Sequence, residues 1–198
     1  MSESNANLAT LIGSRICHDL ISPIGAITNG LELLDLTGGA QGPELDLIAD
    51  SVGNAGARIR FFRIAYGAAG DQNLGRLEVA SVLKDITRGG RLQVTWVPTE
   101  PQSRAGVRLA FLALQCCETA MPYGGTVRID VDDGSWALTG NADKLNIDET
   151  LWAGLVRPGQ AGPVTPALVQ FALLPEVAAD LGRTVRVEHG PGRISVRF

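Results

Sequence analysis

The chain has 198 residues, of which 45% are hydrophobic and 19% charged, a composition typical of globular domains and not of disordered segments. Its net charge of −4 argues against a nucleic-acid-binding protein, which would need a basic face. No apolar run reaches the roughly eighteen residues of a membrane span, and there is no basic-then-apolar leader, disulfide framework or CxxC pattern. We therefore expect a reduced cytoplasmic protein without a membrane partner.

The first predicted element is a long amphipathic helix over residues 8–36. Its apolar positions recur at helical spacing: Leu8, Leu11, Ile12, Ile16, Leu20, Ile24, Ile27, Leu31 and Leu34. His18 lies about 160° around the helix from Leu20, off this apolar stripe, because each residue turns about 100°. Ser22 follows one turn later on the same polar face, and Asp19 is adjacent. The pattern therefore predicts a histidine presented to solvent beside an acid and a hydroxyl.

Pro23 stands inside this helix, where it lacks the N–H that would bond to the carbonyl of Asp19. Such a break costs about 3 kcal/mol. A proline that interrupts helical hydrogen bonding one turn from an exposed histidine indicates a functional site. From composition alone, a surface histidine beside a tolerated kink is the favoured explanation, because most exposed histidines have no function, and the functional interpretation stays open beside it.

A second amphipathic helix follows the glycine-rich turn at residues 38–43 and ends at glycine-rich residues 67–70. Its apolar face is formed by Leu45, Ile48, Val52, Ala55, Ile59, Phe62 and Tyr66. Two helices joined by a short turn form an antiparallel hairpin, which cannot bury two full apolar stripes by itself. We therefore expect a homodimer, in which two hairpins form a four-helix bundle.

Antiparallel pairing about a turn near residue 40 places His18 opposite residue 62 or so. Three nearby residues, Arg58, Phe61 and Arg63, are then candidates for contact with a partner protein, because exposed arginines and aromatics are typical interface anchors. The alternative is that both phenylalanines are core residues and the arginines are merely solvated. For Phe62 we expect the core.

Residues 71–75 are predicted to form a linker, after which helix and strand signals mix. Helices are expected at 78–86, 107–121, 147–155 and 166–181, and strands at 91–97, 126–131, 136–139, 184–188 and 193–198, with a Pro/Gly-rich loop at 159–166. The fold class is therefore α+β, with a helical-hairpin domain at residues 1–70 and an α/β sandwich at residues 76–198. Cys116, Cys117, Trp96, Trp136 and Trp152 are expected to be structural, and His189 a surface turn residue.

The run His18-Asp19-Leu20-Ile21-Ser22-Pro23-Ile24 resembles the phosphoacceptor box of histidine kinases. Residues 111–129 and 181–187 resemble parts of the kinase ATP-binding, Bergerat-like domain. Where a kinase carries the asparagine that helps to hold Mg²⁺ and ATP, this chain has Cys116-Cys117-Glu118. The Asp-x-Gly-x-Gly turn and the Gly-x-Gly-Leu loop are also missing, so an ATP triphosphate would lack its neutralising groups.

An intact histidine helix combined with a degenerate ATPase-like domain resembles the ChpT-type histidine phosphotransferases of bacterial phosphorelays. The run at residues 58–69 is also similar to the second helix of that family. The resemblance implies that His18 is the phosphoacceptor and that Asp19 orients and activates it. It further implies that a set of neighbouring residues contacts the partner: Arg15, Ser22, Pro23, Arg58, Phe61 and Arg63.

The resemblance also implies the reaction and its partners. A phosphoryl group would pass through His18 from the receiver domain of a hybrid histidine kinase to the aspartate of response-regulator receiver domains. We expect no cofactor, neither ATP nor a metal of the chain's own, since Mg²⁺ would come from the receiver. The alternatives are a divergent ATP-dependent histidine kinase and a non-catalytic dimeric scaffold or inhibitor of two-component signalling.

Overall fold

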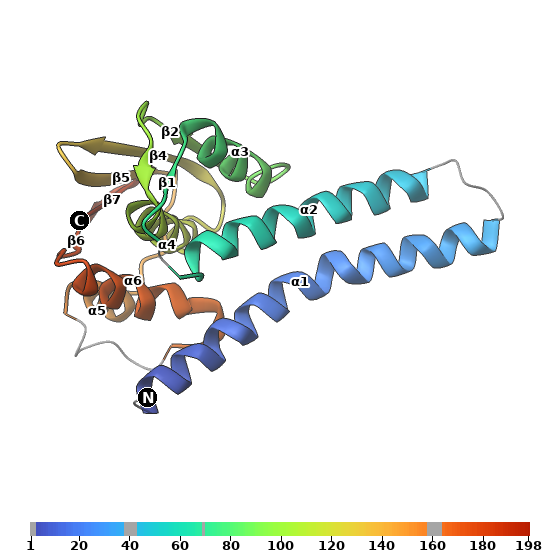
Figure 1. The fold of residues 1–198 in the computed structure, drawn as a ribbon, viewed down its shortest axis with the longest axis horizontal. Helices are drawn as coiled ribbons and strands as arrows, with labels where there is room; N and C mark the ends of the chain where they lie inside the picture. The colour runs from blue at the N-terminus through green and yellow to red at the C-terminus, as the bar shows by residue number, and fades with distance from the viewer. Residues whose placement is uncertain (1–2, 38–42, 69, 158–163) are drawn as a thin grey trace.

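The computed structural model describes residues 3–37, 43–68, 70–157 and 164–198. A helical hairpin projects from a mixed α/β body (Figure 1). Its helices α1 (Glu3–Thr37) and α2 (Pro43–Ala65) lie side by side and antiparallel, as predicted. The predicted glycine-rich turn between them falls almost entirely outside the described residues. Helix α1 continues through Pro23, whose side chain is buried.

The body contains a five-stranded sheet in the order β2-β4-β5-β7-β6. Strand β2 pairs in parallel with β4, and the other neighbours pair antiparallel. The strands span Leu92–Trp96 (β2), Gly125–Asp132 (β4), Ser135–Asn141 (β5), Arg186–Gly190 (β6) and Arg193–Arg197 (β7). Asp133 and Gly134 join β4 to β5 with positive φ angles of 44° and 74°, as a tight hairpin turn requires. The predicted α+β fold class is confirmed.

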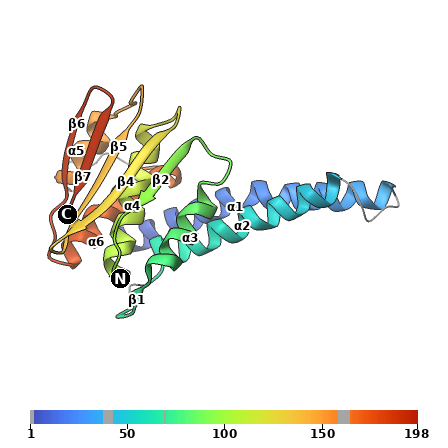
Figure 2. The ribbon, with the colours of Figure 1, turned by 90° about the horizontal axis from the view of Figure 1, so that it is seen from above.

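Helices pack against one face of this sheet (Figure 2). They are α3 (Arg76–Ile86), α4 (Arg104–Ala120), α5 (Glu149–Val156) and α6 (Val169–Asp180), the last preceded by the 3-10 turn η2 (Pro166–Leu168). Helix α4 contacts β4 and β5 on one side and α2 and α6 on the other. It therefore lies at the centre of the body. Its own Cys116 and Cys117 are buried, and so are Trp96, Trp136 and Trp152, as expected for structural residues. The predicted loop at residues 159–166 lies mostly outside the described residues.

The predicted linker at residues 71–75 is partly wrong. Asn73–Leu74 form strand β1, which pairs antiparallel with β3 (Gln102–Ser103) just before α4. Leu74 is buried, so burial and pairing hold the segment against the body. A strand of two residues shows no periodicity, which explains why the sequence pattern did not predict it.

The hairpin and the body share one hydrophobic core. Phe61 of α2 stacks on Phe111 of α4, with ring centroids 4.6 Å apart and planes inclined by 6°. The buried Arg104 donates hydrogen bonds to the carbonyl oxygens of Arg63 (2.6 Å) and Ala68 (3.2 Å). These carbonyls lie at or just beyond the C-terminal end of α2, where no further helical N–H can reach them. Side chains of α4 therefore hold the C-terminal end of α2, where the hairpin joins the body.

No helix in the described part of the chain combines the length and the apolarity needed to cross a membrane.

Candidate functional site

His18 stands on the surface of α1 with its side chain 83% exposed, whereas the neighbouring Asp19 side chain is only 10% exposed. The His18 Nδ1 lies 3.1 Å from Asp19 Oδ1. An ionised carboxylate can only accept a hydrogen bond, so in this pair Nδ1 carries the proton. The lone pair of Nε2 is then free on the solvent side, as a nucleophile requires.

Two arginines hold the Asp19 carboxylate in place. Arg15 Nε lies 2.9 Å from Asp19 Oδ2, and Arg58 Nη1 of α2 lies 3.5 Å from the same oxygen. Arg15 also donates to the Ala167 carbonyl in η2 at 2.5 Å. The acceptor that orients His18 is thus tied to α1, to α2 and, through Arg15, to the body. Arg58 was predicted to flank the histidine, and it lies beside the neighbouring Asp19, with a helix register that differs from the predicted one by about one turn.

Phe61 is not an exposed anchor, and that expectation is wrong. Its side chain is only 3% exposed, because α2 packs on α4 here and Phe61 stacks on Phe111. Phe62 is also buried, as predicted. Arg63 is exposed, but it follows Arg58 by five residues and so points about 140° away around the helix. The structure therefore does not bring Arg63 to the Arg58 side of the site.

Ser22 is exposed one turn after His18, so the predicted polar face is present. Pro23 is buried and cannot offer its ring to a partner, contrary to the expectation. It follows Asp19 by four residues and therefore lies on the side of α1 that faces the rest of the molecule. His189 lies in strand β6, not in a turn, with its Nε2 3.6 Å from Glu149 Oε2.

A recess of about 200 Å³ lies directly behind Asp19. The hairpin contributes Arg15, Asp19 and Arg58 to its wall, and helices α4 and α6 contribute Gln115, Glu118, Thr119 and Gln170. In the sequence, Glu118 stands out only as part of the degenerate ATP motif. Nothing in the local pattern shows that residues about a hundred positions apart meet here.

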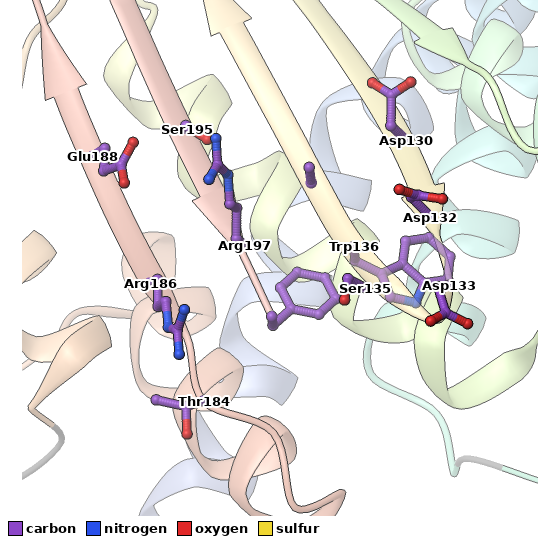
Figure 3. Close-up of a pocket in the computed structure, with 12 residues that line it drawn as sticks. Asp130, Asp132, Asp133, Ser135, Trp136, Thr184, Arg186, Glu188, Ser195 and Arg197 are labelled. Carbon is purple, nitrogen blue, oxygen red and sulfur yellow. The ribbon is translucent and has the colours of Figure 1, made fainter.

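A larger cavity, of about 630 Å³, lies on the face of the sheet turned away from α4. Figure 3 shows Asp130 and Asp132 on β4 at one side of it, and Arg186 and Arg197 on β6 and β7 at the other. Its lining residues come from the sheet strands and adjoining turns, so this cavity is separate from the histidine helix.

In the described part of the chain, His, Cys, Asp and Glu side chains form no cluster of three that could hold a metal ion. Burial raises the pKa of Cys117 to about 12 and raises the pKa of Cys116 well above its usual value. Both thiols therefore stay protonated near neutral pH and are poor nucleophiles and metal ligands. Asp19 is ion-paired with Arg15 and Arg58, so its carboxylate is also poorly suited to bind a metal ion.

The model of the histidine phosphotransferase C-terminal domain family matches residues 76–193. The chain belongs to this histidine phosphotransferase family. The match covers most of the body of this family member and leaves the helix that carries His18 outside it.

Two similar proteins extend the comparison. Protein phosphotransferase ChpT of Brucella abortus (strain 2308) is 38% identical over 134 residues, which cover 65% of this chain and 63% of that protein. The match thus spans slightly less than two thirds of the curated relative. A structure of a bacterial phosphotransferase, solved at 1.7 Å, superposes with a TM-score of 0.81 at 31% identity, covering 100% of this chain and 98% of that one.

Proposed function

We propose that the protein is a histidine phosphotransferase of a bacterial phosphorelay, which carries a phosphoryl group on His18 between receiver domains. The observation that carries this proposal is the exposed His18 imidazole, whose Nδ1–H is held by a mostly buried, doubly ion-paired carboxylate. Membership of the histidine phosphotransferase family supports it. The donor would be the receiver of a hybrid histidine kinase and the acceptor that of a response regulator.

In the transfer, the Nε2 lone pair attacks the phosphorus of the donor's aspartyl phosphate in line with the bond that breaks. The P–O bond to the aspartate breaks and its electron pair returns to the donor carboxylate, while a P–N bond forms on His18. Nδ1 keeps its proton, and Asp19 stabilises the positive charge that the ring acquires. Transfer to the second receiver is the same step in reverse, with the acceptor aspartate as nucleophile.

The chain's contribution is positioning and charge, which dominate phosphoryl transfer. Mg²⁺, which neutralises the moving phosphoryl group in such reactions, would come from the receiver, because Asp19 is already committed to Arg15 and Arg58. We propose that the body does not bind ATP and instead supports the histidine helix. Arg58, with a side chain 34% exposed beside Asp19, and the exposed Ser22 remain proposed partner contacts.

We further propose that two chains form a homodimer through their hairpins. The support is a set of large apolar side chains that one chain leaves exposed at heptad spacing. They are Ile24 and Leu31 on α1, and Leu45, Val52 and Ile59 on α2. A seam repeating every seven residues is typical of helix bundles with coiled-coil-like packing. Pairing two hairpins along these seams would cover both.

The dimer is tested by replacing Val52, which is 53% exposed in the single chain, with glutamate. We expect Val52→Glu to convert the protein from dimer to monomer in sedimentation velocity, because a charge at the centre of the seam cannot be buried unpaired. Leu77→Glu on α3 is the matched control, since Leu77 is 86% exposed and lies outside the hairpin. A Val52→Glu protein that still sediments as a dimer would place the interface elsewhere.

The transfer function is tested by mixing the protein with a receiver domain carrying a radiolabelled aspartyl phosphate, and in parallel with labelled ATP. We expect an acid-labile, base-stable label from the receiver alone, and no heat of ATP binding in calorimetry. Label from ATP would instead identify a divergent kinase. Absence of label from every receiver tested, with normal signalling in cells that carry a His18 variant, would identify a scaffold or inhibitor.

Asp19→Asn is expected to slow phosphoryl transfer by about 10- to 100-fold without preventing it. The neutral amide still fits beside His18 but no longer stabilises positive charge on the ring, and it leaves Arg15 and Arg58 without their shared carboxylate. Single-turnover transfer measured by rapid quench checks the rate. A wild-type rate in Asp19→Asn would show that the contact to Nδ1 does not contribute to transfer.

A further inference from the structure

The recess behind Asp19 holds a carboxylate to which the proposed reaction gives no role. Glu118 lies on α4, near its C-terminal end, and lines the recess together with Arg15, Asp19 and Arg58. Two guanidinium groups and one carboxylate from the hairpin therefore share the recess with one carboxylate from the body. Asp19 is in direct contact with both arginines, whereas Glu118 acts on them across the recess.

We infer that Glu118 is a positioning residue, whose carboxylate shares the positive charge of Arg15 and Arg58 and so leaves Asp19 free to polarise His18. Without Glu118, the Asp19 carboxylate alone would face two guanidinium groups, and the net charge of the set would change from zero to +1. An acceptor already neutralised by two cations is a weaker hydrogen-bond partner for Nδ1–H. Through Glu118, the body of the protein would thereby influence the basicity and reactivity of the His18 imidazole on the hairpin.

The electrostatic environment of Glu118 agrees with this coupling. Glu118 is an exposed residue by its accessible surface, yet desolvation by the surrounding atoms raises the pKa of its carboxyl above the usual 4.5. Arg15 and Arg58 act against this rise in pKa, and Asp19 adds to it. The charge on Glu118 is thus linked to the same three residues that set up His18.

The uncharged polar residues of the recess also favour the two guanidinium groups, and they add no charge that would compete with Glu118. Gln170 donates through Nε2 to Thr119 Oγ1 (3.1 Å), and that hydroxyl donates to the Gln115 carbonyl (2.9 Å). This order fixes the amide orientation and leaves Gln170 Oε1 buried without a hydrogen-bond partner among the described residues. A lone buried acceptor and a carboxylate both line the space behind the two guanidinium groups.

The other titratable groups near the recess are neutral in the working pH range. Burial raises the pKa of Tyr66 to about 12, and its hydroxyl donates to Gln115 Oε1 at 2.9 Å. Burial likewise raises the pKa of Cys116 well above its usual value. With Tyr66 and Cys116 neutral, the charged groups that line the recess around Asp19 are Arg15, Arg58 and the ionised form of Glu118.

The test compares Glu118→Gln, Glu118→Asp and Glu176→Gln in the full chain. Glu118→Gln removes the charge and keeps the shape, whereas Glu118→Asp keeps the charge. Glu176→Gln removes a charge from an exposed position of α6 outside the recess and is the matched control. The first readout is the titration of the His18 imidazole followed by NMR. It requires no phosphoryl transfer, so it is independent of the proposed function.

We expect Glu118→Gln to move the His18 titration midpoint to lower pH, because the added net positive charge disfavours the imidazolium. Glu118→Asp and Glu176→Gln should leave the midpoint near that of the wild type. Equal midpoints in Glu118→Gln and Glu176→Gln would overturn the inference. A purely structural role of Glu118 would lower the melting temperature without a charge-specific shift of this kind.

The second readout rests on the proposed transfer function. The rate of phosphoryl acceptance should fall at acid pH as Nε2 becomes protonated, and in Glu118→Gln this acid limb should move to lower pH by the shift seen in the NMR titration. The plateau rate should fall several-fold, and Glu118→Asp should restore it. If the wild type accepts no phosphoryl group at all, the proposed function fails, while the NMR titration still decides the role of Glu118.

Discussion

His18→Gln is expected to abolish phosphoryl acceptance, reducing the rate by at least about 10³-fold. Glutamine approximates the size and polarity of histidine, but its amide nitrogen has no free lone pair with which to attack phosphorus. Because the His18 side chain is 83% exposed, the change should alter the free energy of unfolding by less than about 0.5 kcal/mol. Loss of label in a protein of unchanged melting temperature would therefore report on chemistry and not on folding.

His189→Gln provides the matched control, because the chain contains two histidines. His189 lies in β6 beside Glu149, and Figure 1 shows β6 at the end of the body away from the projecting hairpin, so His189 should be dispensable for transfer. Acid-labile label on His18→Gln, or its loss in His189→Gln, would show that the phosphoacceptor has been assigned to the wrong residue.

The histidine helix could be predicted because the determinants of its geometry are local. Helical periodicity places His18 off the apolar stripe, and the Asp19 contact joins consecutive residues. The proximity of Arg58 required one further assumption, an antiparallel hairpin with a short turn. Each step depends on spacing within the first 65 residues or so, where one apolar face per helix largely determines the packing.

The remaining features depend on α4, which no pattern in the hairpin encodes. Helical periodicity places Phe62 on the apolar face of α2, but only the packing of α4 against α2 decides that its neighbour Phe61 is covered as well. Pro23 is buried for a similar reason, since the side of α1 that carries it faces the molecule. The charge of Glu118 reaches Asp19 only because α4 crosses the base of the hairpin. Tertiary contacts between distant segments determine these positions, and local periodicity carries no signal for them.

The second large effect is expected at this junction. Phe111→Ala should lower the free energy of unfolding by about 3–5 kcal/mol, because it removes a fully buried ring from the middle of α4 and leaves a cavity beneath Phe61. Leu77→Ala on the exposed surface of α3 should change it by less than about 0.5 kcal/mol. Urea unfolding followed by tryptophan fluorescence and by far-UV circular dichroism checks both variants.

The two probes also decide whether the hairpin and the body are separate folding units. The tryptophans, Trp96, Trp136 and Trp152, all lie in the body, whereas much of the helical signal comes from α1 and α2. If the Phe61–Phe111 stack and the Arg104 bonds join both parts into one cooperative unit, Phe111→Ala should move both transitions together to lower urea. A fluorescence midpoint that falls while part of the helical signal keeps its wild-type midpoint would show that the hairpin folds independently. In that case the body could not fix the Arg15–Asp19 pair through Ala167, and the support for His18 would have to come from the hairpin alone.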